Sequence, residues 1–249
     1  MSTKSIPDVT RINRKEARVL ADAEFDKFAA MAASLTPEEW ATATDCVGWD
    51  VRKMVLHVIG SADSQASPLV FLHQLRKGLP LNKEIDSHHW VDGLNEFQIR
   101  ERSSLTNAEA VAQLRSVGAR AVKGRFRTPL PMRFAPVPFG EPIGWKPVSY
   151  LLEVGFTRDT WAHRIDIHAV IGRPMELDPD HDGRLVADIV AEWALIHGEP
   201  FELVLTGTAG GTFSQGVNGE HVEMDALDFI RTLAGRLTGT GVMRHRLPL

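Results

Sequence analysis

The segment 147–171 constrains the fold of this chain more than any other, because its pattern predicts one long helix. Pro147 suits the first position of a helix, and Gly172 suits its end. At 1.5 Å per residue the helix would be about 37 Å long. Its inward face is apolar toward both ends but carries Asp159 and His163 in the middle. Burying these groups costs free energy unless they are bonded or coordinated, so the segment predicts a helix packed along a polar site.

Three side chains in the sequence suit a divalent metal ion. Asp159 and His163 are i and i+4, so both leave the same face of a helix. His57 borders the apolar stripe of an earlier predicted helix, which Asp50 can cap. Three such ligands leave an open position, the usual arrangement of a catalytic zinc site. Two other interpretations stay open: an ion pair between Asp159 and His163, and a hydrogen-bonded core position for His57.

The first two thirds of the sequence predict a series of helices separated by residues that start or end a helix. Capping boxes at Thr36 and Thr106 each place a glutamate three residues later. Pro68 divides or kinks the helix that contains His57. The predicted helices cover 8–35, a short segment after Thr36, the segment after Asp50, 90–102 and 107–123, and a proline-rich ordered loop covers 127–147.

After residue 175 the pattern changes to a small mixture of helices and strands. Residues 185–196 are helical, and alternation over 201–205 predicts a strand. Asn218-Gly219 predicts a two-residue hairpin between flanking strands. Asp225 is expected to cap a last helix that runs through Arg236.

Composition limits the possible partners. The 249 residues carry a net charge of −4, which argues against nucleic acid as the main partner. No run of about 18 apolar residues predicts a transmembrane helix, and the polar N-terminus lacks the apolar core of a signal peptide. The single cysteine, Cys46, excludes an internal disulfide and is interpreted as a packed thiol. We therefore expect a cytoplasmic protein with a small-molecule partner, no nucleic acid and no membrane; monomer and homodimer both remain open.

Three motifs carry a family resemblance. The first runs from Leu35-Thr36-Pro37-Glu38-Glu39-Trp40 through Cys46-Val47-Gly48-Trp49-Asp50-Val51 to His57, the second is 159–167 followed by Gly172-Arg173, and the third is 225–236. Together they resemble the mycothiol-dependent maleylpyruvate isomerase family, within the DinB-like superfamily. The resemblance covers nearly the whole chain.

The resemblance implies an α+β fold with two domains. Residues 1–174 would form a DinB-like four-helix bundle, and residues 175–249 a small C-terminal α/β domain that is sterol-carrier-like. It also implies a divalent metal, usually zinc, bound by His57, Asp159 and His163. Aspartate stands at position 159 where the family commonly has glutamate, one methylene longer, so metal affinity or identity could differ.

The implied chemistry is that of a metal-activated thiol. Family members use mycothiol or another low-molecular-weight thiol, and a cation favours the nucleophilic thiolate. The expected function is S-transfer or thiol-assisted isomerisation of a small electrophilic substrate.

Three further residues are candidates for binding substrate or thiol. Arg236 is the candidate catalytic residue, since a guanidinium grips carboxylates; an arginine favoured by the helix macrodipole is the other interpretation. Asn95 and Gln98, at i and i+3, are candidates for cofactor binding, although an exposed helix face explains them equally well.

Two alternatives to a thiol-dependent enzyme remain open from the sequence. One is a non-catalytic small-molecule carrier or binding protein with a vestigial metal site. The other is a biosynthetic enzyme of the same fold with a changed substrate. Metal analysis would separate the enzyme from the carrier, and a search for thiol adducts would separate the thiol-dependent enzyme from the biosynthetic one.

Overall fold

The computed structural model describes residues 3–87 and 89–249, and these fall into two compact units. The first unit holds residues 3–17, 133–165 and 173–249, and the second holds residues 18–132 and 166–172. The fold is helix-rich α+β, as predicted. Helices α1 (Arg14–Ser34) and α10 (Phe156–Ile171) each contribute residues to both units. The four-helix bundle, the sterol-carrier likeness and a domain boundary at residue 174 stay predictions.

The first unit is built on a four-stranded sheet in the order β1-β5-β4-β6. β4 lies between β5, which is antiparallel to it, and β6, which is parallel to it. The N-terminal strand β1 pairs in parallel with β5 at the edge. The strands are β1 (Lys4–Ser5), β4 (Phe201–Thr206), β5 (Gly211–Gln215) and β6 (Glu220–Asp225).

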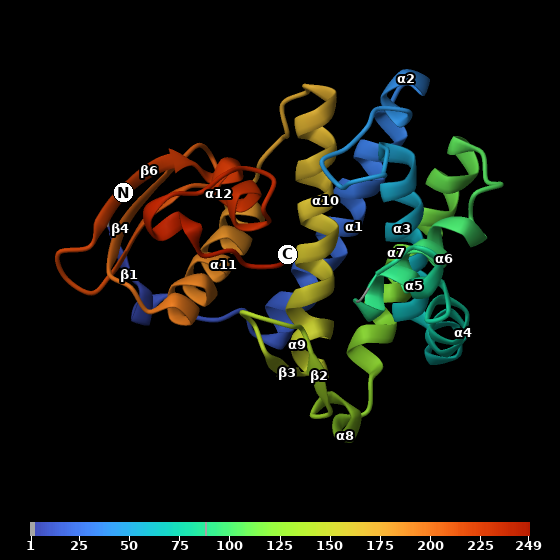
Figure 1. Cartoon of the computed structure of the whole chain (residues 1–249), viewed down its shortest axis with the longest axis horizontal. Helices are drawn as coiled ribbons and strands as arrows, with labels where there is room; N and C mark the ends of the chain where they lie inside the picture. Colours follow the sequence, from blue (N-terminus) through green and yellow to red (C-terminus); the bar gives the residue numbers. More distant parts are fainter. Residues whose placement is uncertain (1–2, 88) are drawn as a thin grey trace. The chain divides into compact units, whose positions relative to one another are not determined.

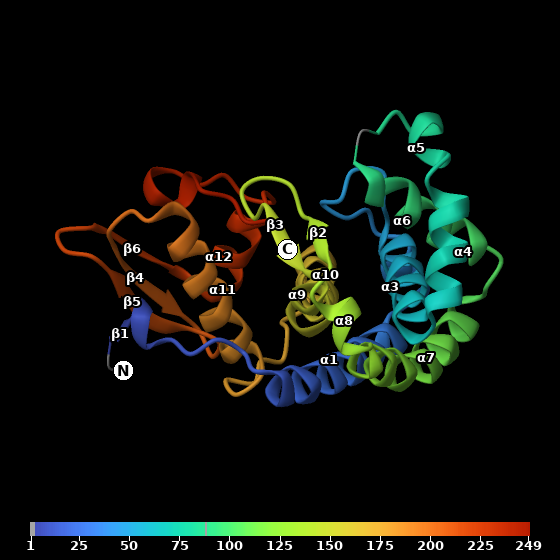
Figure 2. The same ribbon diagram turned by 90° about the horizontal axis from the view of Figure 1, so that it is seen from below.

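Helices α11 (Asp182–His197) and α12 (Ala226–Leu233) cover the same face of this sheet (Figures 1 and 2). Alternate β4 side chains point into the core, as the predicted alternation requires. The ring of Trp193 in α11 lies 5.1 Å from that of Phe201 in β4 and 5.4 Å from that of Phe229 in α12. One aromatic cluster therefore joins both helices to the sheet.

The predicted hairpin at Asn218-Gly219 is wrong. β5 and β6 flank β4 on its two sides, and the hairpin instead joins β4 to β5. A Cβ on Gly219 would lie 2.2 Å from the backbone nitrogen of Phe201, so the chain passes against the start of β4 at this point. Asn218 has a φ of 55°, but this left-handed turn serves the crossing from one side of β4 to the other.

Shorter elements complete the first unit. The boundary between the units falls within α8 (Leu130–Arg133), which leads into the proline-rich segment; the sequence predicted this segment as a loop, and it contains a small antiparallel hairpin. These elements are the 3₁₀ turns Ile6–Asp8 and Gly241–Arg244, β2 (Pro136–Pro138), β3 (Trp145–Pro147), α9 (Val148–Tyr150) and a π-helical turn Leu151–Gly155 before α10.

The second unit is helical. Its core is formed mainly where α3 packs against α7, with Phe28, Met54, Ile59 and Leu114 buried and Ile167 of α10 among them. Its helices, besides parts of α1 and α10, are α2 (Pro37–Trp40), α3 (Val51–Ala66), α4 (Pro68–Gly78), α5 (Leu81–Glu84), α6 (Trp90–Glu101) and α7 (Asn107–Arg127).

Local signals set most helix starts in this unit. Both predicted capping boxes form, at Thr36 with Glu39 and at Thr106 with Glu109. Pro68 separates α3 from α4, as expected. The first predicted helix begins later than expected, at Arg14, because the Asn13 side chain accepts the backbone N–H groups of the next turn. Among the described residues, no helix combines the length and the apolar character needed to cross a membrane.

Candidate functional site

His57 lies on α3, in the middle of the second unit. Asp50 caps this helix by accepting the N–H of Lys53 at 2.7 Å, as the sequence predicted. The apolar residues on either side of His57 are buried, and His57 itself is only 5% exposed. A polar ring at such a position needs bonding partners to offset its lost hydration.

Two contacts within the unit hold the imidazole of His57. Its Nδ1 lies 3.0 Å from Oε1 of Gln98, on α6. The indole of Trp49, in the turn before α3, packs against the ring with centroids 5.2 Å apart. His57 is therefore an oriented buried histidine, so the core interpretation and the ligand interpretation both remain compatible with its surroundings.

In the first unit, one face of α10 is fixed by acidic residues of α11. Arg158 contacts Asp188 at 2.6 Å and Glu192 at 2.5 Å. Asp182 accepts from both Trp161 and Arg164, each at 2.7 Å. The side chains at 158, 161 and 164 share one face of the helix, so these bonds set its rotation about its own axis.

Asp159 and His163 leave the opposite face of α10. A helix turns about 100° per residue, which puts positions 159, 163 and 166 on the side away from 158, 161 and 164. Nε2 of His163 lies 3.5 Å from Oδ1 of Asp159, and their side chains are 10% and 33% exposed. The structure thus brings these two predicted ligands together, while His57 belongs to the other unit.

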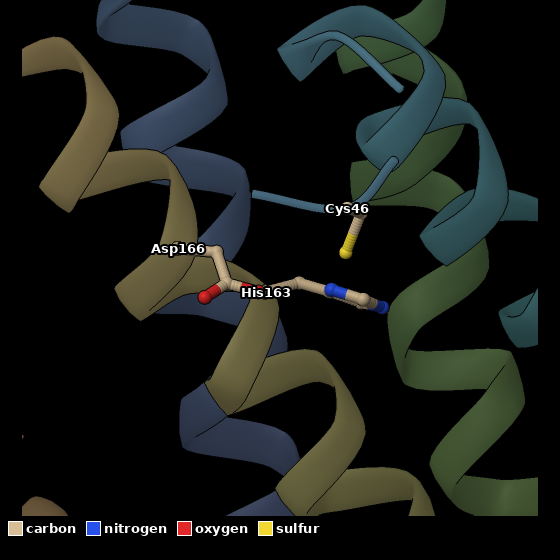
Figure 3. Close-up of side chains that lie close together, drawn as sticks. All are labelled: Cys46, His163 and Asp166. Atoms are coloured by element: carbon tan, nitrogen blue, oxygen red, sulfur yellow. The ribbon is translucent and has the colours of Figure 1, made fainter. Parts of the chain in front are cut away.

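Asp166 and Cys46 are two further residues whose side chains can bind a metal ion. Figure 3 shows Asp166 and His163 leaving α10 one turn apart, and Cys46 on the loop before α3. Asp166 is buried, with 3% of its surface exposed. Cys46 is half-buried and, as the single cysteine of the sequence, forms no internal disulfide. Its backbone N–H donates to Thr44 Oγ1 at 3.2 Å, and its carbonyl accepts from the N–H of Trp49 at 2.9 Å, so the loop is internally bonded.

The buried charges of the first unit shift each other's pKa. Burial raises the pKa of Glu192, but the charge and hydrogen bond of Arg158, with Tyr150 and Lys146, together outweigh it and leave that pKa below its ordinary value. Tyr150 donates its hydroxyl to Glu192 at 2.9 Å, and burial raises the pKa of this phenol. The group is therefore a fixed ion pair with a neutral tyrosine, which stabilises the position of α10.

The remaining predicted residues lie as follows. Gln98 is buried, with 2% exposure, and both ends of its amide are bonded within the second unit. Asn95 is half-buried one turn earlier on α6. Arg236 follows α12 and is half-buried, with Nη1 donating to the carbonyl of Ala234 at 3.2 Å. Substrate or cofactor binding by these three residues stays a prediction.

Sequence reasoning missed two sets of residues. Gln74, which bonds Gln98, has no motif of its own and is fully buried. Asp188 and Glu192, at i and i+4 in an otherwise apolar stretch of α11, did carry a signal. Two carboxylates on one buried face require basic partners, and Arg158 supplies them.

The model of the mycothiol maleylpyruvate isomerase N-terminal domain matches residues 21–168, which is more than half of the chain. The chain belongs to this family. His57, Asp159 and His163 all lie inside the matched region of the mycothiol maleylpyruvate isomerase domain, whereas Arg236 lies outside it.

Two solved structures share the fold. One is the crystal structure of the mycothiol-dependent maleylpyruvate isomerase, with 18% identity and a TM-score of 0.55. The other is a histidine-to-alanine mutant of that isomerase, with 17% identity and a TM-score of 0.55. Each alignment covers 96% of this chain and 93% of the other. No curated protein matches the chain.

Proposed function

We propose that this protein is a mycothiol-dependent isomerase acting on a small, electron-poor alkene. Membership of the mycothiol maleylpyruvate isomerase family supports this activity. The shared fold with the solved isomerase, over nearly the full length of both chains, is consistent with it. We further propose that His57, Asp159 and His163 together hold a divalent cation, with zinc as the first candidate.

The observation that carries the metal proposal is the pairing of His163 with Asp159. Their ligand atoms lie 3.5 Å apart on a helix whose opposite face is fixed by ion pairs. Two imidazoles and one carboxylate are a donor set that suits zinc and leaves an open position. In this proposal His57, already oriented by Gln98 through Nδ1, supplies the third ligand through Nε2.

A bound divalent cation would favour the thiolate form of a nearby thiol, which is the nucleophilic form. Mycothiol, when bound, would supply a nucleophilic sulfur that adds reversibly to the electron-poor double bond, which would let that bond rotate before the same thiol leaves. His57, Asp159 and His163 would hold the cation. Arg236 is the proposed partner for a substrate carboxylate.

Metal content and turnover in matched variants test the proposal. We expect purified protein to carry about one zinc per chain, as in sites with three protein ligands. His57→Ala and His163→Ala should each lose metal and isomerisation of maleylpyruvate with added mycothiol. His221→Ala is the control, because His221 is an exposed histidine on β6. X-ray absorption should show two imidazole nitrogens on the metal.

Two outcomes would contradict the proposal. If both histidine variants keep stoichiometric metal, the ligand assignment is wrong. If the chelated, metal-free protein isomerises the alkene at the full rate, the cation has no part in the reaction.

A further inference from the structure

A chain of buried amide groups ends on the ring of His57. Gln98 on α6 presents Oε1 to Nδ1 of His57 at 3.0 Å. Its Nε2 donates to Oε1 of Gln74 on α4 at 2.8 Å. Nε2 of Gln74 in turn donates to the backbone carbonyl of Gly60 on α3 at 2.9 Å. All three side chains lie within the second unit and are at least nine-tenths buried.

The last group in this chain sets the direction of every bond in it. A backbone carbonyl only accepts, so Gln74 must turn its NH₂ group toward Gly60. Its oxygen then faces Gln98, which must donate to it. That leaves the oxygen of Gln98 facing His57, and an amide oxygen only accepts. The proton on His57 is therefore on Nδ1, a conclusion that rests on donor and acceptor chemistry.

We propose that Gln98 and Gln74 are positioning residues that hold His57 as its Nδ1–H tautomer. In this tautomer the neutral ring carries its lone pair on Nε2, the atom that binds a cation. The use of that lone pair for a metal rests on the proposed function, but the tautomer itself does not. Metal-binding histidines are commonly oriented in this way through their second nitrogen.

The backbone is shaped to allow the contact between α3 and α6. A Cβ on Gly60 would lie 2.5 Å from Cβ of Gln98, so only glycine permits the present approach. Arg102 reinforces it by donating to the carbonyl of Gln98 at 3.0 Å and to Asp63 of α3 at 2.8 Å. Gln98 therefore has little freedom to move away from His57.

Burial makes this series of hydrogen-bonded amides sensitive to the loss of any one of its residues. A buried amide without partners costs free energy, so the members favour the single arrangement in which every bond is made. Gln74 does not contact His57 in this arrangement, yet it decides which end of the Gln98 amide faces the ring. An effect of Gln74 on the His57 tautomer would therefore show that Gln74 sets the orientation of the Gln98 amide and does not act through packing alone.

The test is the tautomer of His57, read by ¹⁵N NMR of the imidazole in metal-free protein and assigned with His57→Gln. Wild type should show the Nδ1–H pattern. Gln74→Met should allow Gln98 to flip and populate the Nε2–H form, and zinc affinity should fall by about 10- to 100-fold. Gln74→Glu should restore the wild-type pattern, because a buried, protonated carboxyl can donate to Gly60 and accept from Gln98.

Gln113→Met is the matched control, since Gln113 donates to Asp63 in the same unit but lies outside the chain of amides. It should leave both the tautomer and zinc affinity unchanged. An Nε2–H pattern for His57 in wild type would overturn the proposal. So would an unchanged tautomer in Gln74→Met. If the tautomer responds as expected but wild type binds no metal, the positioning proposal stands and the metal proposal fails.

Discussion

Nη2 of Arg158 lies 2.6 Å from Oδ2 of Asp188, and both side chains are almost fully buried. The pair joins α10 to α11 within the first unit. Because the same guanidinium also contacts Glu192 at 2.5 Å, one positive charge faces two carboxylates. Burial lowers the pKa of Arg158, but these carboxylates and Tyr150 outweigh it and raise that pKa. The contact fixes the face of α10 that is opposite Asp159 and His163.

Removing this guanidinium should destabilise the fold strongly. Arg158→Met keeps most of the side-chain length but leaves two buried carboxylates without their closest basic partner, which should lower the free energy of unfolding by about 3–5 kcal/mol. Urea denaturation measures the change. Arg18→Met is the control, because Arg18 and Asp22 form an exposed pair at 4.0 Å, worth at most about 1 kcal/mol. Equal losses of unfolding free energy in the two variants would show that the buried pair contributes no more to stability than the exposed pair.

The same network predicts a loss of stability in acid. The folded-state pKa of Glu192 lies below its ordinary value of 4.5, since Arg158, Tyr150 and Lys146 together outweigh the effect of burial. The unfolded chain therefore takes up a proton first as the pH falls. The contribution of Glu192 is complete above about pH 4.5, declines below it, and is lost once the pH falls through the folded-state pKa.

Unfolding curves measured from pH 6 to 2 check this prediction. Glu192→Gln should be less stable than wild type near neutral pH and should lose less stability on acidification. Glu202→Gln is the control, since Glu202 lies on β4 with its side chain 68% exposed. Parallel profiles of stability against pH for wild type and Glu192→Gln would show that the pKa of Glu192 is not lowered in the folded protein.

His197 should weaken the fold at mildly acidic pH. Burial, and then the charge of neighbouring His245, lower the pKa of His197 from 6.5 to about 4. The two rings are stacked with centroids 5.0 Å apart. Since the unfolded chain binds the proton more readily, stability is complete above about pH 6.5 and is lost progressively as the pH falls toward 4.

A variant without a titrating ring isolates this effect. Nδ1 of His197 accepts the backbone N–H of Glu199 at 3.0 Å, and asparagine offers an amide oxygen for the same bond. His197→Asn should therefore lose less stability than wild type between pH 6.5 and 4. Denaturation midpoints at several pH values measure the difference, and a steeper decline in the variant would show that the sign is wrong.

The features that the sequence predicted well are those that depend on neighbouring residues. The capping boxes at Thr36 and Thr106 and the cap at Asp225 form as expected, because each bonds backbone groups within three residues. The pairing of Asp159 with His163 is equally local. Spacing along one helix is enough to predict such contacts.

The features that it missed depend on distant segments. Strand β1 pairs with β5, about 200 residues later, and nothing in Lys4-Ser5 indicates that partner. Asn218-Gly219 forms a left-handed turn, but whether β4 lies between the flanking strands is decided by the whole sheet. Gln98 was predicted as a candidate for cofactor binding, whereas its contacts with Gln74 and His57 depend on the packing of three helices.

A methyl group at Gly60 should disturb the packing of α6 on α3. In Gly60→Ala the new Cβ would lie 2.5 Å from Cβ and 2.7 Å from Cγ of Gln98. Overpacking of this kind costs about 1–3 kcal/mol, and the higher helix propensity of alanine offsets at most about 1 kcal/mol. We expect a net loss of stability, measured by thermal or urea unfolding.

Gly183→Ala provides the matched control for that substitution. Gly183 is also helical, in α11, and its added Cβ would make only ordinary contacts, the shortest 3.5 Å from the carbonyl oxygen of Ala209. Stability there should stay the same or rise by about 0.4–1 kcal/mol. A stabilised Gly60→Ala would mean that α6 moves freely, contrary to the close contact between Gly60 and Gln98.

The carboxylate at position 159 should decide zinc affinity. Asp159→Asn keeps the shape of the side chain but removes its charge, and loss of a metal ligand should exceed the roughly 10- to 100-fold cost of losing an outer hydrogen-bond partner. Asp159→Glu keeps a carboxylate on the same face of α10 and should bind zinc far more tightly than Asp159→Asn. Asp166→Asn, seven residues further along the helix, should have the smaller effect expected of a residue that is not a ligand. Zinc that binds only the folded protein stabilises it by about 2.7 kcal/mol when the zinc concentration is 100 times the Kd. This stabilisation raises the unfolding temperature. Titrating zinc against unfolding temperature in the four proteins therefore ranks them, and equal shifts in wild type and Asp159→Asn would remove Asp159 from the site.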